Sequence, residues 1–576
     1  MAANKDSSNS KYDGGIGLAL SGGGFRASFF HIGVLARLAE CDMLRDIVAI
    51  STVSGGSIVG ALYYLHLKRL FESKNDEDIT PEDYVQIVST IEKDFLKSAQ
   101  KNLRMRTFYN PWKNLKMFKK GYSRSDRIGE LYDEYFYQGI LKNRTETGMI
   151  KMPELLIDPI CWKGDGRFNP IDHNETRKNT KVPVLLINST VLNDGHDWVF
   201  EAKTMGEPLH DSPAFREIDK NWRLCRPDSY ADTLNHKKVK LGKAVAASAC
   251  VSGVFSPLPI SDMYEEDIRV ELVDGGVYDN QGIQSLEDRG CSDFIVSDAS
   301  FSMINIKSPS TSAFSVICRA NLILMDRVRE LQLLPHIKCK NTDMHLMHLR
   351  KELPPVSIMW RADAKSDCHC DTTLNTDNTS YGVNPEAQDR ISRIRTDLDA
   401  YHNVEAYSLM MDGYKMTKQG LKAKKCTDHP VGWNFTSINS RMENPDPYYL
   451  KLLKVSAETF FKAFMLSRRL KLTAGTIAAL LGALILALII IYSEVTISLG
   501  QLAIGIVLLL ILALPSLGRM LPFLEGPFRP ITLLRTILIQ FTLAVTGSIT
   551  VFIALKWIDP IYLEKGNGQD KTDRDT

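Results

Sequence analysis

The first seventy residues contain the same arrangement twice, and this repetition restricts the fold more than any other feature of the chain. A short apolar run at 16–20, IGLAL, is followed by the glycine-rich turn SGGG at 21–24 and then by a helix-like segment. A second apolar run at 46–51 is followed by the serine-rich turn STVSGGS at 51–57 and another helix-like segment. Two strand–turn–helix units predict an α/β fold with a mainly parallel sheet.

Later segments extend this pattern. Residues 182–190, 268–275, 293–299 and 355–360 have the composition of strands. A long helix is predicted over 384–416, because apolar residues recur there at helical spacing. These residues are Ile391, Ile394, Leu398, Tyr401 and Val404.

The last hundred residues are far more apolar than the rest. No charged residue lies between Lys471 and Glu494, between Glu494 and Arg519, or between Arg535 and Lys556. Each gap is about the ~20 residues that a helix needs to cross a bilayer. The sequence therefore predicts three transmembrane helices, at about 472–493, 495–516 and 535–556.

Flanking charges predict the orientation of these helices. Basic residues precede the first span and lie between the second and the third, whereas the first loop has none. Because positive residues stay on the cytoplasmic side, we expect a multi-pass integral membrane protein with its large N-terminal part in the cytoplasm. Residues 1–14 are polar, lack the apolar run of a secretory signal, and are expected to be a disordered tail.

Composition narrows the classes of partner. The formal net charge of +2 gives no reason to expect nucleic acid. With no signal peptide, the ten scattered cysteines are expected to be mostly buried thiols in a reducing compartment. Residues 97–127 carry ten Lys or Arg, one acid and several aromatics. This segment is either a solvated basic face or a surface for anionic lipid headgroups.

The turn at 51–57 offers three serines as a nucleophile. A nucleophilic serine belongs at the sharp bend between strand and helix, in the pattern G-x-S-x-G. Ser54 matches the last glycine of this pattern but has Thr52 in place of the first. Ser57 falls inside the following helix, and Ser51 has no glycine near enough. Ser54 is therefore the best nucleophile of the three.

Two further turns supply complementary groups. The backbone N–H groups of Gly22, Gly23 and Gly24 suit an oxyanion hole, with Arg26 adding positive charge beside it. This loop matches neither the dinucleotide pattern G-x-G-x-x-G nor a phosphate-binding P-loop. Asp274, in LVDGG at the end of a predicted strand, can serve as the general base of a Ser-Asp dyad.

In this order the three blocks resemble one family, the patatin-like phospholipases, which include the cytosolic phospholipases. LSGGGFRASFFHIGVL resembles its glycine-rich block, STVSGGS its nucleophile elbow and LVDGGVYDN its aspartate block. AVAASACVSGVFSPLPI at 244–260 is similar to its Ala/Ser-rich segment, and 187–200 to its central strand. The resemblance implies a three-layer fold and fatty-acyl ester hydrolysis without metal or cofactor.

The same resemblance implies a role for each matching residue. Ser54 would be the nucleophile and Asp274 the base. The amides of Gly22, Gly23 and Gly24 would hold the oxyanion, and Arg26 would contact a substrate phosphate. The expected partners are a membrane lipid substrate and the bilayer. The departure from the family pattern is Thr52, where a glycine is usual.

The expected organisation is a tail at 1–14, an acyl hydrolase domain at 15–365, a helical extension at 366–455, a membrane region at 456–560 and a polar tail at 561–576. Two other functions remain open: an inactive membrane scaffold with this fold, and a thioesterase or protein deacylase. Two other site chemistries are also weighed. One is a zinc site from Cys368, His369 and Cys370 with His345 and His348, and the other is a Ser-His-Asp triad using His336 or His369.

Overall fold

The computed structural model describes residues 12–567 with gaps. The gaps are 13, 120, 142–147, 209–216, 231–235, 265–267, 301–302, 304, 339–342, 354–377, 422–431, 474, 477–482 and 484–524. The described residues form two compact units. One comprises the described residues within 1–107, 121–459 and 566–576, and the other comprises those within 108–120 and 460–565.

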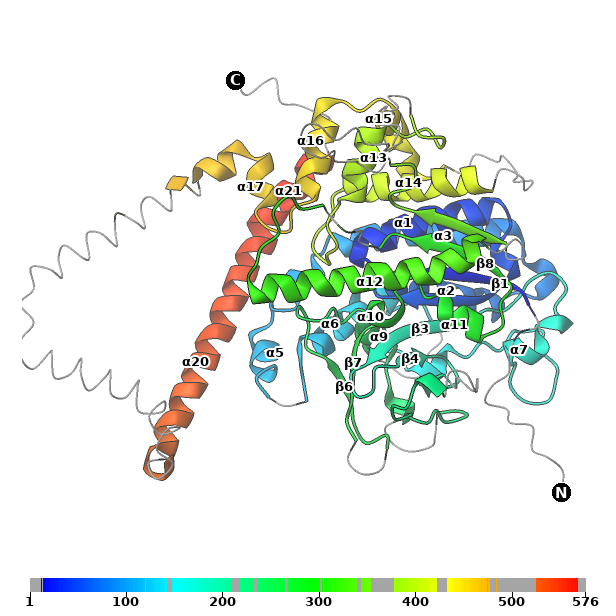
Figure 1. Ribbon diagram of the computed structural model, residues 1–576, viewed down its shortest axis with the longest axis horizontal. Helices are drawn as coiled ribbons and strands as arrows, with labels where there is room; N and C mark the ends of the chain where they lie inside the picture. The colour runs from blue at the N-terminus through cyan, green and yellow to red at the C-terminus, as the bar shows by residue number, and fades with distance from the viewer. Residues whose placement is uncertain are drawn as a thin grey trace, which may run out of the picture. The chain divides into compact units, whose positions relative to one another are not determined.

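The first unit is built on a mixed sheet (Figure 1). The nine described strands are β1 (Ile16–Leu20), β2 (Ile47–Val53), β3 (Val184–Val191), β4 (Asp197–Phe200), β5 (Met205–Gly206), β6 (Leu258–Ile260), β7 (Val270–Asp274), β8 (Asp293–Asp298) and β9 (Met344–His348). Their order is β5-β4-β3-β2-β1-β8-β9, and β7 joins β3 and β6. The prediction of parallel pairing is confirmed from β3 to β9, whereas β4, β5, β6 and β7 pair antiparallel.

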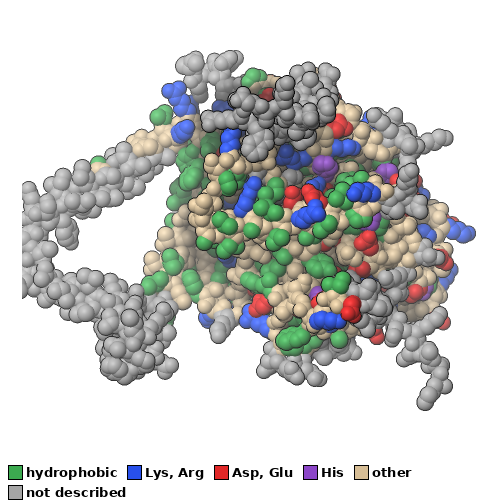
Figure 2. Space-filling view, viewed as in Figure 1, with side chains coloured by type: hydrophobic (Ala, Val, Ile, Leu, Met, Phe, Trp, Pro, Cys, Tyr) green, Lys and Arg blue, Asp and Glu red, His purple; other side chains and the backbone are tan. Residues whose placement is uncertain are grey.

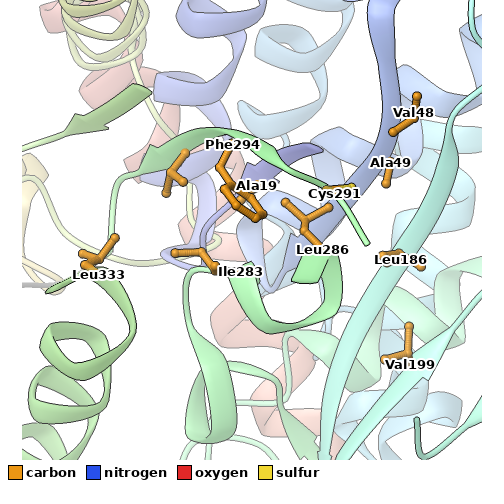
Figure 3. Close-up of a cluster of buried hydrophobic side chains, with 11 residues drawn as sticks. Ala19, Val48, Ala49, Leu186, Val199, Ile283, Leu286, Cys291, Phe294 and Leu333 are labelled. Atoms are coloured by element: carbon orange, nitrogen blue, oxygen red, sulfur yellow. The ribbon is translucent and has the colours of Figure 1, made fainter. Parts of the chain in front are cut away.

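Helices cover both faces of this sheet. Ala19 and Ala49 lie in one buried cluster with Leu286 of α11 (Ile283–Asp288) and Leu333 of α12 (Ala313–Lys338), as Figure 3 shows. Successive side chains of a strand point to opposite faces. Thr52 is three residues beyond Ala49 and meets α2 (Gly55–Phe71), so α2 lies on the other face. This is the predicted three-layer arrangement.

On the α2 side, α1 (Gly24–Glu40) packs closely against α14 (Asn403–Gly420). A Cβ at Gly33 would lie 1.7 Å from the carbonyl oxygen of Met410, and one at Gly413 would lie 2.3 Å from that of Phe30. The two glycines therefore let the backbones of these helices touch. The α3 helix (Pro81–Ala99) completes this layer beside α1 and α2.

The prediction of a single long helix over 384–416 is wrong. The chain instead forms α13 (Pro385–Ser392), a connection, and α14. The buried guanidinium of Arg395 causes the break, because it binds the Asp399 carboxylate at 2.8 Å and the carbonyl of Ala400 at 2.9 Å within that connection. His402 then caps α14 by accepting a hydrogen bond from the Glu405 N–H at 3.1 Å.

Several shorter helices complete the first unit. They are α4 (Leu103–Arg106), α6 (Arg124–Tyr132), α7 (Pro170–His173), α9 (Leu241–Ser248), α10 (Gly276–Asp279), α15 (Asn439–Glu443) and α16 (Pro447–Ser456). The predicted strand at 355–360 lies outside the described residues. The expectation of mostly buried thiols is not met among the described cysteines: Cys250 and Cys291 are buried, Cys161 is half-buried, and Cys225 and Cys318 are exposed. Cys41 is disulfide-bonded.

The second unit contains one helix that is long and apolar enough to cross a membrane, among the residues that are described. It is the span Ile537–Asn567, which includes the end of α20 (Glu525–Ile553) and α21 (Asp559–Asn567). It overlaps the third predicted span at 535–556. The first two predicted spans fall largely on residues outside the description. Membrane association thus has weak support, and the multi-pass topology stays a prediction.

Part of the basic segment lies against this helix. The α5 helix (Pro111–Lys116) contacts α20, and the Asn114 amide donates to the Ala544 carbonyl at 3.2 Å and to Ser548 Oγ at 3.0 Å. Trp112 on α5 is 73% exposed, and Phe118 and Tyr109 are also exposed. Exposed aromatics among basic residues beside an apolar helix favour the headgroup-surface interpretation of this segment.

Candidate active site

Ser54 lies at the sharp turn between β2 and α2. Its backbone has φ 50° and ψ −115°, outside the ordinary regions for a residue with a side chain. Ser54 immediately precedes the first residue of α2, so its side chain sits at the positive end of the helix dipole. It is 6% exposed. This is the geometry expected of a nucleophile elbow.

The two glycine-rich turns are packed backbone against backbone around Ser54. A Cβ at Gly55 would lie 2.1 Å from the carbonyl oxygen of Gly24, and one at Gly56 would lie 2.2 Å from that of Leu20. A Cβ at Gly22 would lie 3.3 Å from the Ser54 Cβ. Because no side chain fits at these positions, the glycines are what bring the loop after β1 up to the serine.

The predicted oxyanion donors are not equivalent. The Gly22 N–H donates to the Asn280 carbonyl at 3.0 Å, so it is already engaged. Within the described part of the chain, the N–H groups of Gly23, Gly24 and Gly55 have no hydrogen-bond acceptor. Gly55 was missed by sequence reasoning, although the residue after a nucleophile often contributes to an oxyanion hole.

Asp274 is the last residue of β7, and β7 brings it to Ser54 through its pairing with β3, where Asp274 lies opposite Ser189. Burial raises the pKa of the Asp274 carboxyl to about 6. The Gly276 N–H, which donates to Asp274 Oδ1 at 2.8 Å, and the Ser54 hydroxyl both act in the opposite direction. A carboxylate with this pKa accepts a proton more readily than an ordinary aspartate.

Ser248, the last residue of α9, connects the serine turn to the aspartate turn. Its Oγ accepts the Ser54 backbone N–H at 2.9 Å, and its carbonyl accepts the Gly275 N–H at 3.3 Å. Its Oγ also lies 2.9 Å from Ser57 Oγ. Sequence reasoning placed Ser248 only in an Ala/Ser-rich segment and gave it no role. The contact joins residues 194 positions apart, which no local pattern reveals.

Thr52, which replaces the usual elbow glycine, is fully buried, and both its hydroxyl and its methyl group contact neighbouring residues. Its Oγ1 donates to the Leu186 carbonyl of β3 at 3.0 Å and accepts from Ser57 Oγ at 3.0 Å. Its methyl group faces Gly60 of α2, where a Cβ would lie only 2.5 Å from Thr52 Cγ2. The close approach of strand and helix is thus retained with the glycine on the helix.

Arg26 occupies a structural position. It is 1% exposed, and its guanidinium donates to the carbonyls of Ala299 at 3.0 Å and Ile394 at 3.0 Å. These bonds tie α1 to the end of β8 and to the connection after α13. A role for Arg26 in holding a substrate phosphate stays a prediction.

The neighbouring histidine supports the loop after β1 but is not a base. His31 is fully buried, its Nε2–H donates to the Ser21 carbonyl at 2.9 Å, and its Nδ1 accepts from Ser297 Oγ at 2.6 Å. Burial lowers the pKa of His31 to about 4, so the ring is neutral near pH 7. Of the triad alternatives, His336 faces Glu287 at 3.1 Å. His369 and the predicted zinc ligands Cys368 and Cys370 lie outside the described residues.

Comparison with known proteins gives one family match and several similar solved structures. A family model described as patatin-like phospholipase matches residues 18–286. Human GIVD cytosolic phospholipase A2 is similar at 11% identity and a TM-score of 0.36, covering 73% of this chain and 62% of that one. VipD from Legionella pneumophila is similar at 11% identity and a TM-score of 0.26, covering 72% of this chain and 67% of that one. No curated protein matches. The chain therefore carries a patatin-like phospholipase domain over residues 18–286.

Proposed function

We propose that this protein hydrolyses fatty-acyl esters of membrane phospholipids or lysophospholipids through an acyl-enzyme on Ser54. The domain family supports lipid acyl hydrolase activity in general. The observation that carries the finer proposal is the positive-φ serine at the β2–α2 turn beside the buried carboxylate of Asp274. These two groups supply a nucleophile and a base of suitable pKa.

The proposed reaction has two halves. Ser54 Oγ attacks the ester carbonyl carbon while its proton passes to Asp274, and the oxyanion is held by the N–H groups of Gly23, Gly24 and Gly55. Protonated Asp274 then gives its proton to the leaving alcohol oxygen as the C–O bond breaks. In the second half, Asp274 takes a proton from water, the hydroxide attacks the acyl carbon, and Ser54 leaves with that proton restored.

A lipid substrate is favoured by the helix that lies near Asp274. The α12 helix contacts α10, which follows Asp274 directly, and many apolar side chains of α12 are exposed. They include Phe314, Val316, Ile317, Ile323, Leu324, Leu331, Leu334 and Ile337. Figure 2 shows hydrophobic side chains gathered where α12 lies. An exposed apolar surface of this kind is typical of a membrane or lipid contact.

The experiment is a paired assay on the purified full chain in detergent or vesicles. Wild type should release fatty acid from phospholipid or lysophospholipid vesicles and react with a fluorophosphonate. Ser54→Ala should abolish both, and Asp274→Asn should abolish turnover. Full hydrolysis by Ser54→Ala would disprove the proposal. Absence of labelling in folded wild type would instead favour the scaffold, and faster hydrolysis of acyl-CoA than of phospholipid would favour a thioesterase.

We further propose that the catalytic domain faces the cytoplasm and is anchored by C-terminal helices. The support is the span Ile537–Asn567 and the distribution of flanking charges. Anchoring would make the encounter with a bilayer lipid effectively intramolecular. Protease protection tests the orientation: in sealed vesicles whose cytoplasmic face points outward, protease should digest an N-terminal tag on this protein.

A further inference from the structure

A second cluster of chemically active side chains lies at the hairpin between β3 and β4. Asp194 and His196 are in the hairpin turn, and Glu207 directly follows β5. The side chains of these residues are 1%, 5% and 2% exposed. None of them belongs to the Ser54 site.

The histidine ring has one partnered and one unpartnered nitrogen. Nε2 lies 2.7 Å from Asp219 Oδ2, so the Nε2–H donates to that carboxylate. In the neutral ring, Nδ1 then carries a lone pair. It faces two carboxylates, because Asp194 Oδ1 and Glu207 Oε2 each lie 3.3 Å from Nδ1.

The buried His196 Nδ1 has no hydrogen bond of ordinary geometry to any part of the chain that the structure describes. The two carboxyl groups that face this nitrogen, Asp194 and Glu207, lie against each other. Burying such groups without a partner is costly, and a cation between the ring nitrogen and the two carboxyl groups would relieve that cost.

The charge of the cluster is compatible with a divalent cation. Burial and the neighbouring Asp194 raise the pKa of the Glu207 carboxyl to about 9 in the cation-free chain, so a bound cation would displace a proton there and leave Asp194, Glu207 and Asp219 with three negative charges. Arg223 contributes one positive charge, with its Nη2 2.5 Å from Asp219 Oδ2 and its Nη1 3.9 Å from Glu207 Oε2. When the three carboxylates are ionised, the charges of the acidic groups and Arg223 sum to −2, which a bound divalent cation would neutralise.

We propose that Asp194, His196 and Glu207 bind one divalent transition-metal cation of the Zn²⁺ type. A tetrahedral site with bonds of about 2.0–2.2 Å places its donor atoms about 3.3–3.6 Å apart, which is the separation of Nδ1 from the two carboxylate oxygens here. One imidazole with carboxylates suits Zn²⁺ or Mn²⁺ better than thiolate-seeking metals. Asp219 orients the ring from its other nitrogen, as carboxylates do in zinc sites.

The cation has a structural role in this proposal. It links the β3–β4 hairpin to the chain after β5. The hairpin continues β3, whose Asn188 amide donates to the Thr52 carbonyl at 2.9 Å and whose Ser189 lies opposite Asp274. The cation therefore supports the strand to which both halves of the Ser54 site are attached, without taking part in ester hydrolysis.

The test measures binding on the purified full chain, independently of activity. After chelator treatment and dialysis, Zn²⁺, Mn²⁺, Ca²⁺ and Mg²⁺ are titrated separately, with bound metal determined by elemental analysis and unfolding followed by circular dichroism. Wild type should bind about one equivalent of Zn²⁺ with a raised unfolding temperature. Co²⁺ in its place should give the absorption of a tetrahedral ion.

Variants identify the ligands. His196→Asn and Glu207→Gln should lose the bound equivalent, and Asp219→Asn should weaken binding about 10- to 100-fold. His336→Gln is the matched control, since His336 pairs with Glu287 at 3.1 Å elsewhere and the variant should bind as wild type does. Failure of all four cations to bind wild type stoichiometrically would overturn the proposal, whatever the variants do. Unchanged Zn²⁺ binding by folded His196→Asn would also overturn it.

Discussion

Thr52 and Gly60 are complementary: the Thr52 methyl group occupies the space that a side chain at Gly60 would need, since a Cβ there would lie 2.5 Å from Thr52 Cγ2. Thr52 is on β2 and Gly60 on α2, so the pair sets how closely the strand and the helix approach on either side of Ser54. The departure of this elbow from the usual glycine pattern is thus compensated eight positions later in the chain.

Gly60→Ala should disturb the elbow, although alanine is the better helix former. Overpacking of this kind costs about 1–3 kcal/mol, and the displaced turn should also lower turnover. Adding Thr52→Ser should restore both, because serine keeps the hydroxyl that bonds Leu186 and lacks the methyl. Urea unfolding and ester hydrolysis measure the two effects.

The control for this pair is Gly420→Ala. Gly420 is also helical, but a Cβ there would meet nothing within 4 Å. It should leave stability and turnover nearly unchanged. If Thr52→Ser failed to improve Gly60→Ala, the contact between the two residues would not be what limits the elbow.

Ser248→Ala should slow the chemistry while leaving the fold intact. It removes the acceptor of the buried Ser54 N–H, a loss of about 1–3 kcal/mol at the residue that holds the nucleophile in its unusual conformation. We expect kcat to fall about 10- to 100-fold with KM nearly unchanged, and fluorophosphonate labelling to slow in parallel.

Ser456→Ala is the matched control for Ser248→Ala. Ser456 is likewise fully buried at the last position of a helix, α16, where its hydroxyl donates to the Leu452 carbonyl at 2.8 Å. Equal losses of turnover in the two variants would show that Ser248 acts only through general stability.

The rate of ester hydrolysis should depend on the ionisation of Asp274. Its pKa is raised to about 6, and it must be deprotonated to accept the Ser54 proton. On a soluble ester, kcat/KM should therefore be flat above pH 7 and fall about tenfold per pH unit below about pH 5.5. A profile without an inflection between pH 5 and 7 would contradict Asp274 as the base.

Asp279 provides an internal control for this profile. Burial raises the pKa of its carboxyl to about 6 as well, but its oxygens accept the backbone N–H groups of Gln281, Gly282 and Gln284. Asp279→Asn should keep the inflection at the same pH, even where the rate itself changes.

The span Ile537–Asn567 should decide membrane retention. Leu543 and Ile549, near the middle of the predicted span, are 58% and 55% exposed, and a lysine at a helix centre costs about 2.5–3.5 kcal/mol in a bilayer. Leu543→Lys with Ile549→Lys should move protein out of the carbonate-resistant membrane fraction, whereas valine at the same positions should not. Retention of the lysine variant would mean that other segments hold the protein.

The sequence by itself determined the fold class and both strand–turn–helix units, and it pointed to Ser54 and Asp274 as the candidate nucleophile and base. It could do so because these features depend on local chemistry: alternation of apolar runs with glycine turns, and one reactive residue at each turn. The break of the helix expected over 384–416 was not visible, because it depends on the buried ion pairs of Arg395 and not on helical periodicity.

Only the tertiary structure decided how the site is held together. Ser248 reaches Ser54 across 194 positions, Gly60 makes room for Thr52 from the facing helix, and the Arg26 guanidinium meets carbonyls of two distant segments. The pKa of Asp274 likewise follows from burial that no short motif records. The physical reason is common to all four: hydrogen bonding, steric fit and desolvation depend on which segments meet in space, and the chain brings those segments together only when the sheet has formed.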